Sequence, residues 1–384
     1  MYQWVIVGGG IQGSMIAAHL LHYNKVNKKD LLIIDPFEQP MTKWKTLTKR
    51  MGMSYLRSPS VHHLDPDPYS LKKYAKSNDY AGAFLGYYGR PRLDMFNQHC
   101  DDLFNREGVK DCWRRGFVTG LEKDTAHWNI SIDQAEVVEA ESVVLALGVN
   151  NRPHYPDWAD VLKRHKPTRV HHIFKENAPD QEGRCTIVGG GITAAHMAKS
   201  LAEKASEPVS LIKRHPFRVE DFDSDPGWLG PKYLHRYNRT RCYQKRRNLI
   251  KEARNRGSIT KGLRNELKTL QQKGKLTIIT DEINEAAQKN TEIKLKLMHH
   301  PAIYTEHLIL ATGAEACLPG KEWLEKTIAK YELPCAPCGF PIVNQNLEWK
   351  DGLYVAGALA ELEIGPAARN IAGGRKAAER IVHA

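Results

Sequence analysis

The stretch of residues 4–14 constrains the fold more than any other part of the chain. A short apolar run leads into Gly8, Gly10 and Gly13, which match the pattern G-x-G-x-x-G. This spacing lets the backbone turn sharply, approach a pyrophosphate closely, and pack the following helix against the strand. Asp35 ends the next apolar run, where an acid would accept hydrogen bonds from a ribose. The stretch therefore predicts a dinucleotide-binding strand, turn and helix, and the alternative is a glycine-rich turn in an ordinary α/β domain.

A second copy of this pattern follows in the middle of the chain. An apolar run leads into Gly189 and Gly191, and Ala194 takes the third glycine position, which is a permitted variant. The next apolar run ends in Lys213 and Arg214, at the place where an acid would contact a ribose 2′-hydroxyl. Basic side chains there suit a 2′-phosphate, so we expect NADPH in preference to NADH on the second module.

The remaining apolar runs predict an α/β fold with two Rossmann-like modules, each with a small β-meander. In the first module, short half-buried strands that include Val118 precede an apolar strand ending at Gly148, and the matching strand of the second module ends at Gly313. Ligands bind at the carboxyl ends of such strands, so we expect these three residues beside the cofactors. The length of 384 residues agrees with two domains, because single cores rarely grow past about 250 to 300 residues.

Cysteine content and apolar runs bear on location. The seven cysteines are odd in number and scattered, which is not typical of a disulfide framework. The first expected strand begins at residue 2 and leaves no room for a cleavable signal, and no apolar run approaches the roughly 20 residues of a membrane span. We therefore expect a cytoplasmic protein without a membrane span. No metal site is expected, because a lone C-x-x-C is too little for zinc.

The closing segment completes a resemblance to a known superfamily. A strand and glycine turn at Gly357 are followed by Gly365, Pro366 and a helix that runs to Ile381. With this segment the chain resembles the two-dinucleotide-binding flavoproteins, in which such a segment returns to the FAD domain. Pro366 suits the first turn of a helix. The resemblance implies that these residues belong to the flavin site and that the helix directs its positive end at the flavin.

Within that superfamily the chain is most similar to the flavin-dependent monooxygenases, including those that N-hydroxylate lysine and ornithine. The shared features are the Leu-Ala-Leu-Gly strand that ends at residue 148, the Ala-Thr-Gly of residues 311–313, and the pair His171 and His172 about 17 residues before the second glycine motif. The resemblance implies a discontinuous FAD domain of residues 1–165 and 305–384, and an inserted NAD(P)H-binding domain of residues 166–304.

The same resemblance implies the chemistry. NADPH passes a hydride to FAD, the reduced flavin meets O2 and forms a peroxyflavin, and a small-molecule amine or thioether takes the distal oxygen. Because the cofactor carries the difficult chemistry, the protein needs only to orient the rings, stabilise charge and keep water out.

The loop of residues 51–66 is the candidate wall of the flavin-ring pocket. It mixes glycine, proline and serine with Arg57, His62 and His63 and has no helical or strand periodicity. We take these three side chains as catalytic candidates near the ring. The alternative is a structured loop whose histidines only satisfy its turns.

Two further features leave other functions open. Cys335 and Cys338 form a C-x-x-C of redox-dithiol spacing, which would suit a reductase of a disulfide or quinone. The basic stretch of residues 228–275 holds fifteen Lys or Arg against two acids. It is either a solvated helical face or a surface for RNA or another polyanion, with Tyr233, Tyr237 and Tyr243 as stacking surfaces.

Overall fold

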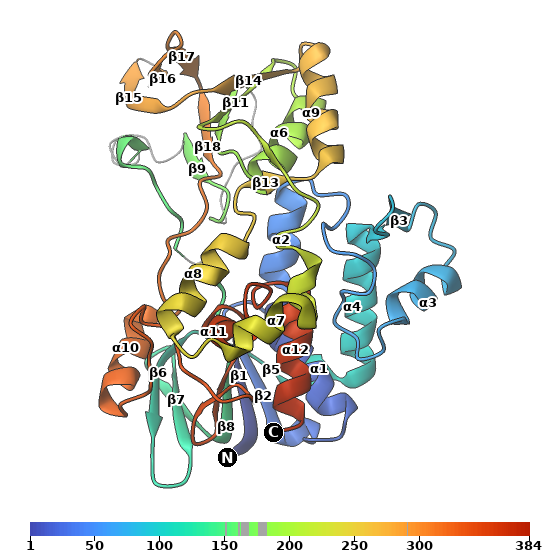
Figure 1. Cartoon of the computed structure of the whole chain (residues 1–384), viewed down its shortest axis with the longest axis vertical. Coiled ribbons are helices and arrows are strands. Elements are labelled where there is room, and N and C mark those ends of the chain that lie inside the picture. Colours follow the sequence, from blue (N-terminus) through green and yellow to red (C-terminus); the bar gives the residue numbers. More distant parts are fainter. Residues whose placement is uncertain (150–151, 160–161, 163–168, 176–182, 290) are drawn as a thin grey trace.

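The computed structural model describes residues 1–149, 152–159, 162, 169–175, 183–289 and 291–384. Two α/β modules stand one above the other along the long axis, and both chain termini lie in the lower, first module (Figure 1). Among these residues no helix is long and apolar enough to cross a membrane. Within the same described part of the chain, no group of three or more His, Cys, Asp or Glu is arranged to hold a metal ion.

The first module contains a mostly parallel sheet formed by β1 (Tyr2–Val7), β2 (Leu31–Asp35), β5 (Trp113–Arg115), β6 (Val118–Lys123), β7 (Trp128–Ile132), β8 (Glu136–Leu145), β19 (Glu348–Lys350) and β20 (Leu353–Val355). β1 lies between β2 and β8 and pairs in parallel with both. The turn after β1 therefore sits in the middle of the carboxyl edge of the sheet. β6 and β7 form the predicted meander and return the chain to β8.

Helices cover this sheet and bury its central strands completely. α1 (Ile11–His22) packs between α12 (Ile371–Val382) and α4 (Leu93–Glu107), and α10 (Lys321–Lys330) packs against the meander. Val5, Ile6 and Ile33 are fully buried because the sheet is covered on both faces, which explains their near-continuous apolar runs. The segment between β2 and α4 adds α2 (Thr42–Arg50), α3 (Ser70–Ser77), β3 (Phe84–Leu85) and β4 (Arg90–Pro91).

The second module repeats the plan with a fully parallel sheet of β14 (Leu276–Thr280), β11 (Val209–Lys213), β10 (Cys185–Val188), β18 (His307–Leu310) and β9 (Val170–His172), in that order. α6 (Ile192–Lys204) follows the second glycine turn, and α9 (Lys261–Gln272) packs against it. The meander of this module is β15 (Ile283–Lys289), β16 (Glu292–Leu297) and β17 (Ile303–Thr305). The expected fold class, two Rossmann-like modules each with a meander, is thereby confirmed.

The paired strands correct one predicted domain boundary. β18 runs between β10 and β9 in the second sheet, so the chain returns to the first module after residue 310 and not at residue 305. Strand pairing decides this, because residues 307–310 are joined to Cys185–Val188 by a continuous parallel ladder. The other predicted boundary, between residues 165 and 166, lies outside the described residues.

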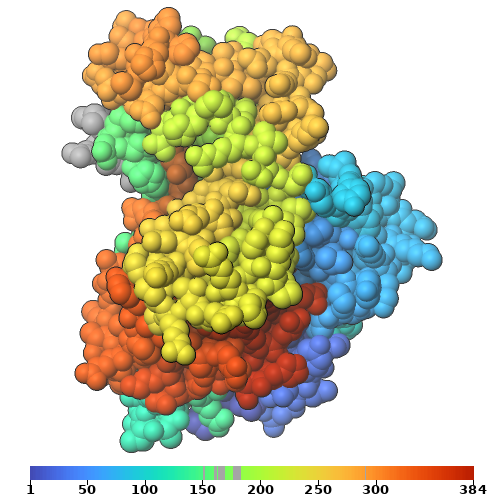
Figure 2. Space-filling model, viewed as in Figure 1, coloured from blue at the N-terminus to red at the C-terminus, as the bar shows by residue number. Residues whose placement is uncertain are grey.

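The basic stretch of residues 228–275 does not form one unit of the second module. α7 (Pro231–Arg239) and α8 (Tyr243–Ala253) pack on the first module, whereas α9 belongs to the core of the second. Tyr237 is fully buried, and its hydroxyl donates to the carbonyl oxygens of Glu361 and Leu362 at 3.2 and 2.9 Å. It therefore cannot stack on a nucleic acid as predicted. α7 and α8 cover the front of the first module in yellow (Figure 2).

Candidate functional site

A large cavity of about 1410 Å³ lies between the two modules. Its wall includes the first glycine turn at residues 8–12 and, from the start of α6, Ile192, Thr193 and His196. The first glycine turn and the start of α6 therefore face the same space, whereas Gly189, Gly191 and Ala194 of the second motif do not line it. Six of the lining side chains are Lys or Arg and three are Asp or Glu. This excess of positive charge suits ligands that carry several phosphates.

The glycines of the first turn are required for two different reasons. At Gly8, φ is +103° and an added Cβ would lie 2.6 Å from the carbonyl oxygen of Ala146, while at Gly13 it would lie 1.8 Å from the carbonyl oxygen of Gly8. These two glycines let the backbone pack on itself. Gly10 has φ −72°, caps α1, lines the cavity and has open space where its Cβ would be. The bare backbone and helix N-terminus at Gly10 fit a pyrophosphate that approaches from the cavity.

Asp35 lines the cavity at the tip of β2, as predicted. Its Oδ2 accepts a hydrogen bond from the backbone N–H of Gly9 at 2.7 Å, and its Oδ1 accepts one from Phe37 at 3.0 Å. Burial is the largest influence on this carboxyl group and raises its pKa. A carboxylate offers about four lone-pair sites, so Asp35 can bind a ribose hydroxyl while it holds the glycine turn in place.

The second turn has the same geometry, with one addition. Gly189 has φ +152°, and an added Cβ would lie 2.5 Å from the carbonyl oxygen of Ala311 and 3.1 Å from the Cβ of Ala194. Gly191 caps α6, and an added Cβ would lie 3.4 Å from the Cα of Gly257. The loop that joins α8 to β13 (Ser258–Ile259) therefore lies against this turn. No local sequence pattern predicts this contact, because the two glycines are 66 positions apart.

Lys213, which was predicted to contact the 2′-phosphate of NADPH, is buried and contacts other parts of the chain. The side chain is buried, its Nζ donates to the carbonyl oxygen of His215 and to the Oγ1 of Thr280, and it lies 4.8 Å from the ring centroid of Phe217. Burial also lowers the pKa of the Lys213 ammonium group. Arg214, the next residue, is exposed and is not among the residues that line the cavity.

The closing helix begins later than predicted. α12 starts at Ile371 with Asn370 as its N-cap, so Pro366 is not in its first turn. Gly365 and Pro366 do not line the cavity, and an added Cβ at Gly365 would contact Leu234 and Tyr237 of α7 instead. Arg369 and residues 370–372 line the cavity at the start of α12, where Gly365 and Pro366 were expected. Asparagine is a preferred N-cap residue, so the sequence did hold a signal for this start.

Of the remaining predicted cofactor residues, some line the cavity and one does not. Val118, Gly148 and Gly357 line the cavity. An added Cβ at Gly148 would meet nothing within 4 Å, which leaves room for a ligand against its backbone. Gly313 has φ +88° and accepts a hydrogen bond from the backbone of His154, but it is not a lining residue.

Arg57 and His62 both line the cavity, and they differ in their hydrogen bonding and charge. The Arg57 guanidinium donates to the carbonyl oxygens of residues 220–222 and to the Oγ of Ser258, so it ties its loop to the second half of the chain. The N–H donors of Arg57 are therefore engaged in hydrogen bonds within the chain. Burial lowers the pKa of His62 to about 4, which keeps its imidazole neutral near pH 7.

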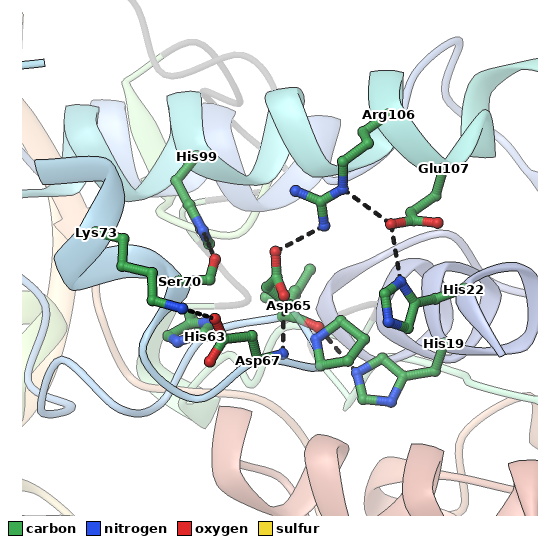
Figure 3. A network of polar contacts seen from close by, with 12 residues as sticks. His19, His22, His63, Asp65, Asp67, Ser70, Lys73, His99, Arg106 and Glu107 are labelled. Carbon is green, nitrogen blue, oxygen red and sulfur yellow. Dashed lines mark hydrogen bonds and ion pairs between the residues drawn. The ribbon is translucent and has the colours of Figure 1, made fainter. Parts of the chain in front are cut away.

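His63 does not line the cavity, so the structure gives no support to its predicted catalytic role. Its Nε2 lies 3.1 Å from the carbonyl oxygen of Pro68, and its ring packs edge-on against His99. Both histidines belong to a polar network between α1, α3 and α4, in which Arg106 donates to Asp65 at 2.8 Å (Figure 3). His63 therefore hydrogen-bonds within its own structured loop, which is the alternative stated in the sequence analysis.

The C-x-x-C pair also lies away from the cavity. Cys335 and Cys338 are free thiols, and neither lines the cavity. Burial raises the pKa of Cys335, which disfavours a reactive thiolate. The Sγ of Cys338 is 3.3 Å from the Nε of Arg247 on α8.

Comparison with known proteins agrees with this geometry. Residues 2–227 match the family model of the pyridine nucleotide-disulphide oxidoreductases. The chain belongs to this family. A search of curated proteins by sequence found no match. As a member of the family, the chain is a flavin-dependent oxidoreductase that uses FAD and NAD(P)H, which confirms the two-dinucleotide flavoprotein interpretation.

Solved structures share the fold over the full length of this oxidoreductase. An ornithine hydroxylase from Pseudomonas aeruginosa is 17% identical with a TM-score of 0.78, covering 100% of this chain and 98% of that one. An ornithine N-hydroxylase from Kutzneria sp. 744, with reduced FAD, NADP⁺ and L-ornithine, is 14% identical with a TM-score of 0.79 and the same coverage. A bacillithiol disulfide reductase from Staphylococcus aureus is 15% identical with a TM-score of 0.64, covering 100% and 97%.

The buried histidines make the stability of this oxidoreductase depend on pH. Burial lowers the pKa of His19, His63 and His99 from 6.5 to about 4. Below pH 6.5 the unfolded chain therefore binds more protons than the folded one, so stability falls as the pH falls toward 4. Each histidine contributes at most about 1.4 kcal/mol per pH unit in this range. Urea unfolding at pH 7.5, 6.5 and 5.5 should show a small loss of stability between the first two values and a larger loss between the second and the third.

The variant His99→Asn should reduce this loss by the share of one histidine, and His235→Asn, at an exposed position, should leave it unchanged. A free energy of unfolding that stays level from pH 7.5 to 5.5 would contradict the neutral state of the network.

Proposed function

We propose that FAD lies along the first glycine turn and NADPH along the second, and that the chain is an NADPH-oxidising monooxygenase of a small amine or thioether. The observation that carries this proposal is the one cavity that is lined by the first glycine turn and by the start of α6, the helix that follows the second glycine turn. Its volume of about 1410 Å³ exceeds the roughly 300 to 1,000 Å³ of single-ligand pockets. Two dinucleotides can therefore meet there.

The residues around the cavity would bind and enclose the cofactors. The helix starts at Gly10 and Asn370 supply free N–H groups and positive dipole ends, and Asp35 accepts from the ribose. FAD, when bound, supplies the hydride acceptor and the reaction with O2. The Arg57 tie holds the loop of residues 51–66 against residues 220–222 and so helps to exclude water.

His62 would act as a hydrogen-bonding residue and not as a base. Its side chain lines the cavity, and its pKa of about 4 lies far below that of an ammonium group. An imidazole with that pKa does not deprotonate an alkylammonium substrate efficiently. It can, however, accept or donate one hydrogen bond while neutral.

The likeness to ornithine N-hydroxylases supports an amine substrate, and that to a bacillithiol disulfide reductase supports the alternative, electron transfer to a disulfide or quinone. Against the alternative, Cys335 and Cys338 lie outside the cavity wall. An anionic partner remains a separate proposal. It would contact exposed cations of the basic stretch of residues 228–275, here called the insertion, such as Lys232, Arg236 and Lys245.

Gly10→Val should give a folded but colourless protein. The backbone of Gly10 is open to a β-branched residue, and nothing in the chain meets its Cβ within 4 Å, so only a cofactor would be displaced. Flavin absorbance per chain and the melting temperature measure the two effects. Gly13→Val is the contrasting variant, because its Cβ would strike the backbone of Gly8 and prevent folding. A yellow, fully loaded Gly10→Val protein would show that FAD binds elsewhere.

Arg214 and Arg256 should determine the preference for NADPH. Arg214 is exposed at the tip of β11, and Arg256 is exposed beside Gly257, which lies against the second glycine turn. A charge-assisted contact to phosphate is worth about 1.5 to 3 kcal/mol, so the double alanine variant should lose roughly ten- to hundredfold in NADPH affinity and little in NADH affinity. Arg236→Ala on α7 is the control. An unchanged ratio of the two dissociation constants would place the 2′-phosphate elsewhere.

Cys335→Ser should retain oxygen-dependent NADPH oxidation, because the cysteine pair lies outside the cavity. The measurement is NADPH and O2 consumption by the FAD-loaded variant with a panel of small amines, together with the number of electrons that the protein accepts anaerobically. A monooxygenase takes two electrons per flavin in both proteins. Loss of turnover in folded Cys335→Ser, with four electrons taken up by the wild type, would favour the disulfide or quinone alternative.

A further inference from the structure

A buried carboxylate joins the insertion to the cofactor cavity. Glu361 of α11 (Glu361–Ile364) is 1% exposed. Arg369 donates to both of its oxygens, from Nε at 2.7 Å and from Nη2 at 2.9 Å, and Arg247 of α8 donates to the same carboxylate from Nη1. Forked contacts of this kind fix the orientation of a guanidinium as well as its position.

Arg369 is the member of this trio that lines the cavity. It directly precedes Asn370, the N-cap of α12, and the first turn of that helix contains no acid. Two guanidinium groups and one carboxylate leave one positive charge. That charge and the positive end of the helix dipole therefore act on the same wall of the cavity.

Arg247 does more than attach the insertion. It is buried, its guanidinium lies 4.2 Å from the ring centroid of Phe340, and it approaches Glu361 closely. Burial by itself would favour the neutral Glu361 carboxyl, but the hydrogen bonds and charges of Arg369 and Arg247 outweigh it and lower the pKa. Removing either arginine would thus change the charge of the trio and not only its packing.

We propose that Glu361 is a positioning residue that fixes Arg369 against the flavin, and that Arg247 supplies the second positive charge, so that the inserted helix α8 sets the electrostatics of the redox site. The inference rests on the proposed binding of FAD to the first module. FAD bound there would accept a hydride, that is two electrons and one proton, from NADPH, which would leave as NADP⁺, and the reduced ring would then carry one negative charge. A fixed positive charge nearby favours that state.

The chain offers a matched control one residue away. Arg246 pairs with Glu363 at 3.1 Å, joining the same two helices as Arg247 and Glu361. Neither Arg246 nor Glu363 lines the cavity, and Glu363 pairs with Arg380 instead of Arg369. Arg246→Gln therefore weakens the attachment of the insertion without altering the trio.

Sulfite titration of the FAD-loaded protein tests the proposal without NADPH or O2. Sulfite adds through its sulfur lone pair to N5 of the oxidised flavin and leaves a negative charge on the ring, so its affinity reports the same stabilisation. We expect Arg369→Gln and Arg247→Gln each to weaken sulfite binding at least tenfold. The same tenfold change in the reduction equilibrium lowers the two-electron midpoint potential by about 30 mV.

The sulfite affinities of further variants distinguish an effect of charge from an effect of packing. Arg369→Lys keeps the charge and should restore most of the sulfite affinity. Glu361→Gln leaves two positive charges but removes the forked contact that orients Arg369, so it should weaken sulfite binding. Arg246→Gln should stay within twofold of the wild type. Equal sulfite affinity in the wild type, Arg369→Gln and Arg247→Gln would overturn the proposal, as would an Arg246→Gln effect as large as that of Arg247→Gln.

Failure of the inference can be distinguished from failure of the proposed function. If the arginine variants match the wild type in sulfite affinity while NADPH still drives amine oxygenation, the inference alone is wrong. If the arginine variants shift the potential as expected but no amine is oxygenated, the function alone is wrong. A wild type that binds no FAD overturns both.

Discussion

The architecture depends on close approach of bare backbone at the two glycine turns. A Cβ at Gly8 or Gly13 would strike backbone oxygen of the first module, and one at Gly189 would strike Ala311 in the second. Because these contacts are allowed, α1 and α6 begin directly at the carboxyl edges of their sheets, with their free N–H groups exposed to a ligand. Both helix starts face one cavity, and the proposed transfer between two cofactors follows from that arrangement.

The insertion shows how a basic stretch can be used inside a protein. Arg246 and Arg247 are paired with Glu363 and Glu361, and Tyr237 is buried between the insertion and the first module. Part of the positive charge of this stretch therefore holds α7 and α8 on the first module. The exposed cations of the insertion, such as Lys232, Arg236 and Lys245, form a separate surface.

Local sequence patterns predicted most of the fold but only part of the site. The glycine spacing, the apolar runs and Asp35 were sufficient to predict the two modules and the first glycine turn, because the residues that form each of these features lie close together in the sequence. Lys213 and His63 were misplaced because partners of both lie far away in the sequence: Thr280 contacts Lys213 from 67 positions away, and His99 packs against His63. Pro366 was misplaced for a local reason, because α12 begins five residues later, after its N-cap Asn370. The contacts of α8 with Glu361 span 114 positions, which no local pattern reports.

Anaerobic titration with NADPH, followed by air, tests the central claim most directly, because it needs both cofactors in the one cavity. One equivalent of NADPH should bleach one equivalent of bound FAD. Air should then restore the oxidised spectrum with the uptake of one O2 per NADPH, giving an oxygenated amine and water when an acceptor is present and hydrogen peroxide when it is absent. Bound FAD that NADPH does not bleach, or bleached FAD that air leaves reduced while a disulfide or quinone reoxidises it, would contradict the account.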